Sequence, residues 1–121
     1  MRERPTVFVM EAQAKAALPV IESMSRAGIR VAAGSEKRFN SGFYSRGCRE
    51  RHIYPSPRDR RADFQAWLLE FLRRRRMAML FALGHYGADA VNDIQTEVRK
   101  HTRLIMPESI SSINPLMRIF T

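Results

Sequence analysis

Short apolar runs alternate along the chain with segments in which apolar residues recur every three or four positions. The runs predict buried β-strands at 6–10, 29–33, 52–54, 77–83 and 103–106. The periodic segments predict helices at 15–27, 59–76, from 89 onward, and 110–120. Alternation of strands with helices is typical of a parallel sheet covered on both faces. The pattern therefore predicts a three-layer α/β/α domain with about five parallel strands.

Two connections in this pattern are polar. Residues 35–51 are basic and show no clear period, so we expect a loop there with one irregular helical turn. The tetrapeptide Gly84-His85-Tyr86-Gly87 follows the fourth apolar run, and we expect it to form a strand-to-helix turn. Asp89 is then the expected start of the following helix.

Composition limits the class of protein. The 121 residues are 45% hydrophobic and include a single cysteine, which excludes a disordered chain and a disulfide scaffold. The apolar run at 77–83 is far shorter than the roughly 20 residues that a membrane-spanning helix needs. The apolar stretch at 7–10 is also too short for a signal peptide. We therefore expect one domain over residues 1–121, a cytoplasmic location and no membrane partner.

The charge is strongly basic, with 21 Lys and Arg against 12 Asp and Glu, a formal net charge of +9. Such a balance suits nucleic acid, an anionic substrate or an acidic partner surface. The run Arg73–Arg76 reads more readily as a solvated helix end than as a nucleic-acid contact, so we do not expect a nucleic-acid partner. Cys48 lies among arginines that should lower its pKa, but no base is placed to make it a nucleophile.

Ligands of open parallel sheets bind outside the carboxyl ends of the strands. The first strand-to-helix connection, residues 10–16, contains no glycine, which argues against a dinucleotide site. The loops at the other strand ends combine glycine with polar side chains, and Glu11 is suited to hold an amine. No spacing of His, Cys, Asp or Glu indicates a metal site, and no residue is assigned a catalytic role. The predicted substrate-binding residues are Glu11, Gly34, Ser35, Gly84, His85 and Tyr86.

The order of these segments resembles the N-terminal, pre-ATP-grasp domain of ATP-grasp ligases of the carbamoyl-phosphate-synthase-like type. The resemblance covers nearly the whole chain and depends on the order and spacing of short motifs. The matching segments are Val7–Met10, Ala17–Gly28, Gly34-Ser35, Tyr44-Ser45, Tyr54-Pro55-Ser56-Pro57, Met79-Leu80-Phe81 and Leu104-Ile105-Met106-Pro107.

The resemblance implies a Rossmann-like fold and a role as the substrate-side domain of an ATP-dependent carboxylate–amine or carboxylate–thiol ligase. The family's ATP-binding and metal-binding residues lie in later domains, so none is assigned here. ATP and Mg²⁺ are implied for the full-length family, with no cofactor in this chain. We therefore expect the full-length protein to be a ligase and this chain alone to be inactive, with no ATP turnover.

The partners implied are an ATP-grasp domain on the same chain, toward which residues 109–121 lead, and a small anionic substrate. The apolar positions within Ile110–Phe120 also allow self-association as a homodimer. Two other functions remain open from the residues alone. One is a small basic nucleic-acid-binding module that uses the basic segment 35–61 and the run Arg73–Arg76. The other is a ligand-sensing α/β module without enzymatic activity.

Overall fold

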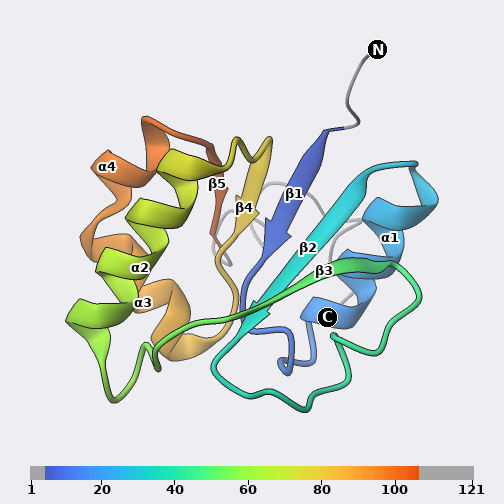
Figure 1. The fold of residues 1–121 in the computed structure, drawn as a ribbon, viewed down its shortest axis with the longest axis horizontal. Coiled ribbons are helices and arrows are strands. Elements are labelled where there is room, and N and C mark those ends of the chain that lie inside the picture. Colours follow the sequence, from blue (N-terminus) through green and yellow to red (C-terminus); the bar gives the residue numbers. More distant parts are fainter. Residues whose placement is uncertain (1–4, 107–121) are drawn as a thin grey trace.

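The computed structural model describes residues 5–106 and shows a single five-stranded parallel sheet with helices on both faces (Figure 1). The strand order is β3-β2-β1-β4-β5, and every neighbouring pair is parallel. The strands are β1 (Thr6–Val9), β2 (Arg30–Ser35), β3 (Cys48–Ile53), β4 (Met79–Phe81) and β5 (Arg103–Ile105). The helices are α1 (Ala17–Arg26), α2 (Arg61–Arg74), α3 (His85–Asp93) and α4 (Gln95–Arg99). The predicted Rossmann-like α/β fold is confirmed.

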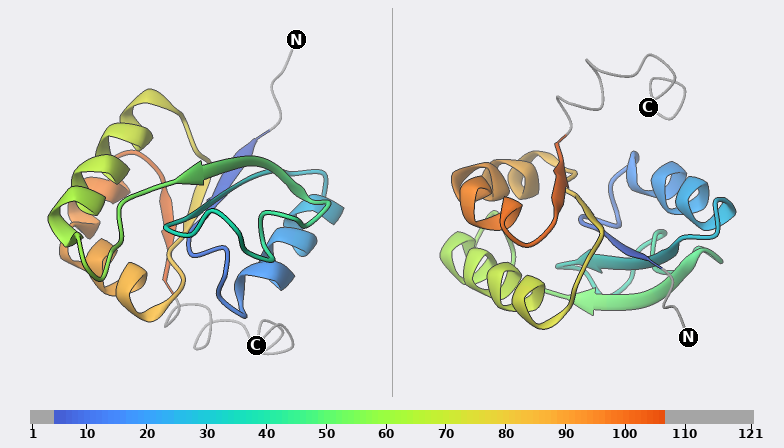
Figure 2. Two further views of the ribbon diagram at one scale, coloured as in Figure 1. Left: turned by 60° about the horizontal axis from the view of Figure 1, so that its bottom comes forward. Right: turned by 90° about the horizontal axis from the view of Figure 1, so that it is seen from above.

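The sheet separates two apolar cores. On one face, the α1 residues Val20 and Ile21 pack against Val7 and Val9 of β1. On the other face, the α2 residues Phe64 and Leu68, together with parts of α3 and α4, cover Phe8 and Leu80. Figure 2 shows α1 on one side of the sheet and the other helices on the opposite side. Because successive β1 side chains point to opposite faces, the continuous apolar run of β1 supplies both cores.

The order of the strands creates a switch point between β1 and β4. After β1 the chain continues into α1 on one face, and after β4 it continues into α3 on the other. The two connections therefore diverge at the carboxyl ends of these adjacent strands. In open α/β sheets, ligands bind in the crevice at such a point.

Several predicted boundaries were wrong. β3 begins at Cys48, so part of the segment expected to be a loop is an edge strand whose exposed side chains include Arg49 and Arg51. Edge strands avoid further pairing in this way, and the charges hide the strand pattern. β4 occupies only Met79–Phe81 of the apolar run 77–83. The segment 110–120 lies outside the described residues.

The predicted start of the third helix was also wrong. α3 begins at His85, with Gly84 at its N-cap position, so the glycine-flanked tetrapeptide forms the first turn of a helix. The helical pattern expected from Asp89 onward is interrupted at Ile94, where α4 begins. No helix among residues 5–106 is long and apolar enough to cross a membrane.

Candidate functional site

Glu11 lies at the switch point, directly beyond β1. Its side chain is 4% exposed, and its backbone has a φ of 53°, which is uncommon for a residue other than glycine. The Glu11 backbone N–H donates a hydrogen bond of 2.8 Å to the hydroxyl of Tyr54, at the end of β3. A buried tyrosine from the sheet's edge strand thus helps to hold this unusual backbone conformation.

A chain of hydrogen bonds joins Glu11 to the end of β2. Gln13 donates through Nε2 to Glu11 Oε2 at 2.8 Å and accepts through Oε1 from the Ser35 hydroxyl at 2.7 Å. Ser35 Oγ in turn accepts from the backbone N–H of Lys37 at 2.9 Å. The polar side chains that follow β1 and end β2 therefore satisfy one another, which fixes the orientation of the carboxylate.

The other side of the Glu11 side chain lies against the first turn of α3. A Cβ atom added to Gly84 would lie 2.9 Å from Glu11 Cγ, and one added to Gly87 would lie 2.8 Å from Glu11 Oε1. Both positions therefore need glycine if Glu11 keeps its place. The N-terminus of a helix carries partial positive charge, which favours a carboxylate beside it.

Burial raises the pKa of Glu11, while the hydrogen bonds from Gln13 and Tyr54 act in the opposite direction. Burial, together with the nearby Glu11 carboxyl, raises the pKa of Tyr54 well above its usual value, so this phenol stays protonated. No ion pair forms between Glu11 and any described residue. A buried carboxyl without an ionic partner is the kind of group that a cationic ligand stabilises.

The structure brings some of the predicted site residues together. Glu11 contacts Gly84 directly and is linked to Ser35 through Gln13, while Gly34 is buried against the rings of Phe8 and Tyr54. The grouping of these six residues as a binding site remains a prediction.

His85 and Tyr86 lie apart from that network. Both are exposed, their rings meet at 5.1 Å, and Arg58 lies over the Tyr86 ring at 5.3 Å. Sequence reasoning missed Gln13 and Tyr54. A polar residue two positions after Glu11 and a tyrosine ending the third apolar run are the signals that could have indicated them.

The site does not suit a pyrophosphate. The connection from β1 to α1 contains no glycine, so side chains keep a ligand away from the backbone N–H groups at the start of α1. The carboxyl of Glu11 would also repel a phosphate. Within residues 5–106, no group of three His, Cys, Asp or Glu side chains could hold a metal ion.

The environment of Cys48 corrects one sequence expectation. Burial raises the pKa of this thiol, and the effect outweighs that of Arg51, which acts in the opposite direction. The sequence shows the neighbouring arginines but not the burial of a side chain at the start of an edge strand.

Comparison with known proteins shows the fold and no more. No protein-family model and no curated protein matches the chain. Among solved structures, glycinamide-RNase-transformylase T from Mycobacterium tuberculosis superposes with a TM-score of 0.60 at 14% identity, over 82% of this chain and 28% of that one. Pal from Bacillus thuringiensis gives a TM-score of 0.61 at 6% identity, over 84% of this chain and 38% of that one.

An oxidoreductase of the short chain dehydrogenase/reductase family from Burkholderia thailandensis gives a TM-score of 0.58 at 12% identity. That match covers 98% of this chain and 58% of the other. The chain thus spans less than two thirds of the length of each of these proteins. Similarity at such low identity shows that the chain is an α/β protein of Rossmann-like fold. Its function has to be inferred from the residues of the site.

Proposed function

We propose that this chain is the substrate-side N-terminal domain of an ATP-dependent carboxylate–amine or carboxylate–thiol ligase of the ATP-grasp type. The order of the sequence motifs supports this proposal, as does the shared fold with the transformylase from Mycobacterium tuberculosis, an ATP-grasp enzyme. The oxidoreductase neighbours share that fold equally, so fold alone does not choose between the two classes.

The observation that carries the choice is the buried Glu11 at the switch point. A dinucleotide-binding domain needs glycines and free N–H groups beside its first strand, whereas this chain has a carboxyl there, oriented by Gln13. A carboxylate with no ionic partner favours an amine. Glu11 would therefore bind the amino group of an acyl acceptor, and Ser35 would keep Gln13, and through it the carboxylate, in place.

ATP and Mg²⁺ do not fit the described residues, which offer neither a glycine-rich phosphate loop nor a cluster of metal ligands. In the proposed ligase both would be bound by the ATP-grasp domain. The contribution of this chain is to bind and orient one substrate and to exclude water around the carboxyl of Glu11.

The test follows the backbone amide signals of the protein by NMR during titration with small ligands. One series uses amino acids and other small amines that carry an acidic group, and a separate titration uses NADPH. We expect shifts centred on Glu11, Ser35 and Gly84 for one amine class, and none for NADPH. Glu11→Gln preserves shape but removes the charge, so it should abolish the response. Glu36→Gln, which removes a carboxylate from the same edge of the sheet, should retain it.

Three results would contradict the proposal. One is NADPH binding with shifts at the start of α1, which would place the chain with the oxidoreductases. Another is the lack of an ATP-grasp coding sequence, either in the reading frame after Thr121 or in a protein that forms a complex with this domain. ATP turnover by the chain alone would also contradict the proposed division of labour.

A further inference from the structure

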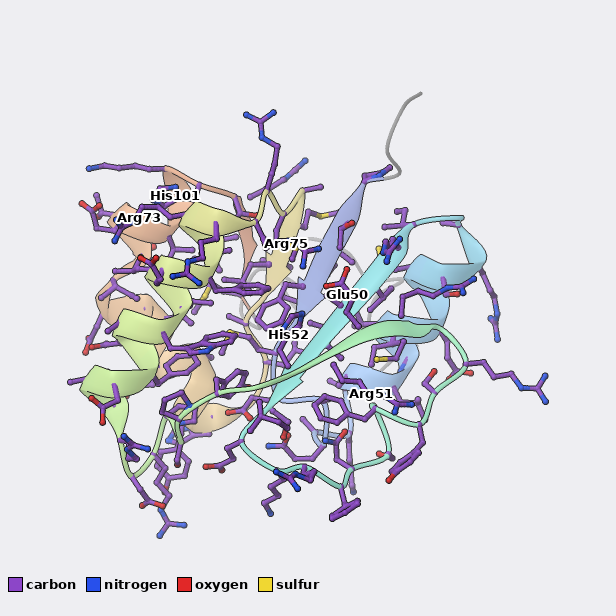
Figure 3. The ribbon with its side chains drawn as sticks, viewed as in Figure 1. Glu50, Arg51, His52, Arg73, Arg75 and His101 are labelled. Atoms are coloured by element: carbon purple, nitrogen blue, oxygen red, sulfur yellow. The ribbon has the colours of Figure 1, made fainter. Side chains whose placement is uncertain are left out.

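The amino ends of the strands, opposite the candidate substrate site, form a second region of interest. A hollow of about 290 Å³ lies there between the end of α2 and the residues after α4. Arg73 and His101 both line it and lie near each other in Figure 3. The cationic side chains lining this hollow are Arg73, Arg74, Arg76 and Lys100, and no acidic residue lines it.

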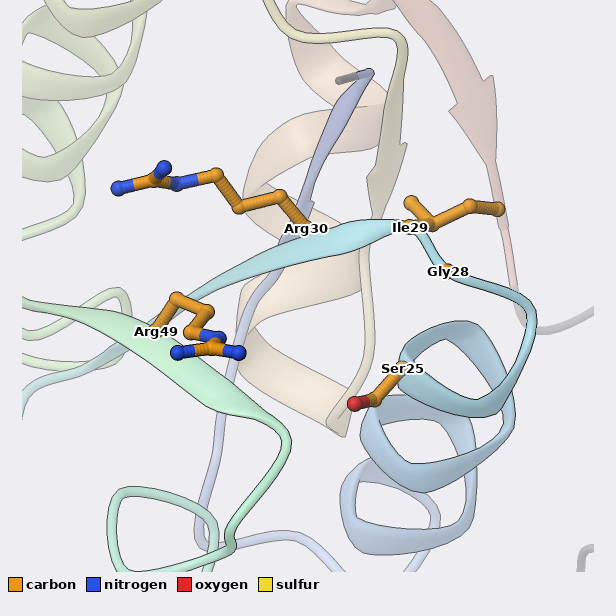
Figure 4. A pocket seen from close by; sticks show the side chains of 5 residues that line it. All are labelled: Ser25, Gly28, Ile29, Arg30 and Arg49. Atoms are coloured by element: carbon orange, nitrogen blue, oxygen red, sulfur yellow. The ribbon is translucent and has the colours of Figure 1, made fainter.

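Two further hollows lie at the same edge of the sheet, around the end of α1. One, of about 430 Å³, is bordered by Arg30 from β2 and Arg49 from β3, with Ser25 of α1 on its other side (Figure 4). The other, of about 290 Å³, extends along α1 from Leu18 to Arg26 and is lined by Arg26 and Arg46 together with the acidic Glu22. Each hollow at this edge therefore carries at least two arginines.

Glu50 connects these arginine groups across the sheet. Its carboxylate receives two hydrogen bonds from Arg75, of 2.7 and 2.9 Å (Figure 3). The same carboxylate lies 3.3 Å from Arg30 Nε. Arg75 follows α2 and Arg30 begins β2, so the cationic side chains form a track from α2 to the edge strand β3. We call this set the amino-edge track, and its members used below are Arg30, Arg49, Arg73, Arg75, Arg76 and Lys100.

Helix stabilisation explains only part of the track. Arg73 and Arg74 pair with Glu70 in the last turns of α2, where cations favour the helix dipole. Arg76 lies beyond α2, and Arg49 lies in a strand. Among the described residues, neither side chain has an ion pair or hydrogen-bond partner, and both are exposed. These two arginines are available to an external anion.

We propose that the amino-edge track binds the sugar–phosphate backbone of a nucleic acid. Five strands spaced about 4.8 Å apart give the track a length of roughly 20 Å, enough for several successive phosphates. The large exposed aromatic side chains, Phe39, Tyr44 and Tyr86, belong to loops and a helix start at other positions. With no exposed ring for base stacking on the track, binding depends on phosphate charge and is independent of sequence.

This inference goes beyond the ligase proposal and uses the opposite edge of the sheet. In the sequence, the alternative of a nucleic-acid-binding module depends on two separate basic segments, 35–61 and Arg73–Arg76. The fold adds Arg30 and brings Arg49, from the first of these segments, to the same edge of the sheet as Arg73–Arg76.

The test is fluorescence anisotropy of a labelled mixed-sequence oligonucleotide of about two helical turns, titrated with the full chain over a range of salt concentrations. With three or more phosphates neutralised, the logarithm of the affinity should fall against the logarithm of salt with a slope of about −2 or steeper. A second oligonucleotide of unrelated sequence should bind within about twofold of the first.

The triple variant Arg73→Gln, Arg76→Gln, Lys100→Gln should weaken binding at least about tenfold and flatten the salt slope. The matched control removes the same number of charges from other exposed positions, as Lys37→Gln, Arg38→Gln, Arg60→Gln, and should weaken binding less than about threefold. The single variant Arg49→Gln should also weaken binding, because it interrupts the far end of the track. It provides an independent test if the triple variant does not fold.

Three results would overturn the proposal. Equal weakening by the two triple variants would show attraction by net charge alone. A salt slope near zero would exclude phosphate contacts. Competition by polyglutamate as effective as that by unlabelled oligonucleotide would assign the track to an acidic protein surface instead.

Discussion

Glu11 and Glu50 lie at opposite ends of the sheet, and their carboxyl groups have opposite pKa shifts because their surroundings differ. Glu11, beyond the carboxyl end of β1, is buried beside two glycines, and burial raises its pKa. Glu50, near the amino end of β3, accepts hydrogen bonds from Arg75 and His52, and these lower its pKa to about 2. Within residues 5–106, the Glu11 carboxyl has amide and hydroxyl partners but no cation, whereas Arg75, Arg30 and His52 surround the Glu50 carboxyl.

The difference separates a structural role from a recognition role. Glu50 stabilises the fold because its charge is already matched, and it holds α2 against the edge strand. Glu11 is oriented but not neutralised, so a cationic ligand would improve its environment. Glu11, whose pKa is raised and which lies at the switch point, is thus the stronger candidate for binding a ligand. Glu50, whose pKa is lowered by its partners, is the stronger candidate for stabilising the fold.

The largest expected effect comes from the glycine that accommodates Glu11. Gly84→Ala places a side chain at a φ of +80° and 2.9 Å from Glu11 Cγ, so it should destabilise the fold by about 2–4 kcal/mol. Gly28→Ala is the control, because Gly28 has the same φ but nothing within 4 Å of an added Cβ. It should cost only about 1–2 kcal/mol. Chemical denaturation measures both, and equal losses would show that the contact with Glu11 contributes nothing.

Removing the charge of Glu50 should have the next largest effect. Glu50→Gln should lower the free energy of unfolding at pH 7 by about 1–3 kcal/mol, the usual contribution of hydrogen bonds to a charged group. Because the folded-state pKa is lowered from 4.5 to about 2, this contribution is present above pH 4.5 and is lost as the pH falls toward 2. Denaturation curves of both proteins should therefore converge in acid, and a difference that persists near pH 2 would contradict the ion-pair explanation.

Glu11→Gln should act in the opposite direction and more weakly. Because the folded-state pKa of Glu11 is raised, its ionisation opposes folding as the pH rises above 4.5. The glutamine variant lacks this loss, so it should gain stability relative to the natural protein between acid and neutral pH, by up to about 1 kcal/mol. The measurement is the same pH series of denaturation curves. A stability difference that does not change with pH would mean that the carboxyl ionises as freely in the folded protein as in the unfolded chain.

The smallest effect concerns Cys48 at the amino end of β3. Burial raises the pKa of its thiol, so less thiolate is present near neutral pH and iodoacetamide should modify the folded protein more slowly than the unfolded one. Mass spectrometry of timed samples, with and without urea, measures the two rates. Faster reaction in the folded state would show that the neighbouring arginines dominate after all.

The sequence was sufficient for the architecture because the apolar runs and helical periods are local signals. The apolar run at 6–10 predicts a strand buried on both faces, and the helical spacing of apolar residues from Phe64 to Leu72 predicts α2. It was insufficient for β3, because the charged residues of Cys48–Ile53 are balanced by partners distant in the sequence, such as Arg75. A strand stabilised by such pairs has no apolar alternation to detect.

The candidate site was only partly predictable for a related reason. Strand ends indicate which residues lie at the carboxyl edge, and this principle selected Glu11 and Ser35. The link between them depends on Gln13, and the backbone of Glu11 depends on Tyr54, 43 positions later. Hydrogen bonds between residues so far apart cannot be inferred from spacing. The sequence likewise indicates two basic segments, 35–61 and Arg73–Arg76, but not that Arg49 and Arg76 lie at the same edge of the sheet.

The packing of Glu11 against α3 also bears on how this protein can change through evolution. Position 84 requires glycine for two reasons, its positive φ and its close approach to Glu11. A shorter side chain at position 11 would therefore not allow a larger residue at position 84. Gly87 has no such backbone constraint, and the contacts that an added Cβ would make there are with the Glu11 side chain and the end of Met10. Substitutions at 11 and 87 should therefore be coupled, with a larger residue at 87 tolerated only after Glu11 has become smaller. Related proteins with a small residue at position 11 should therefore be the ones that carry a residue larger than glycine at position 87, in the first turn of α3.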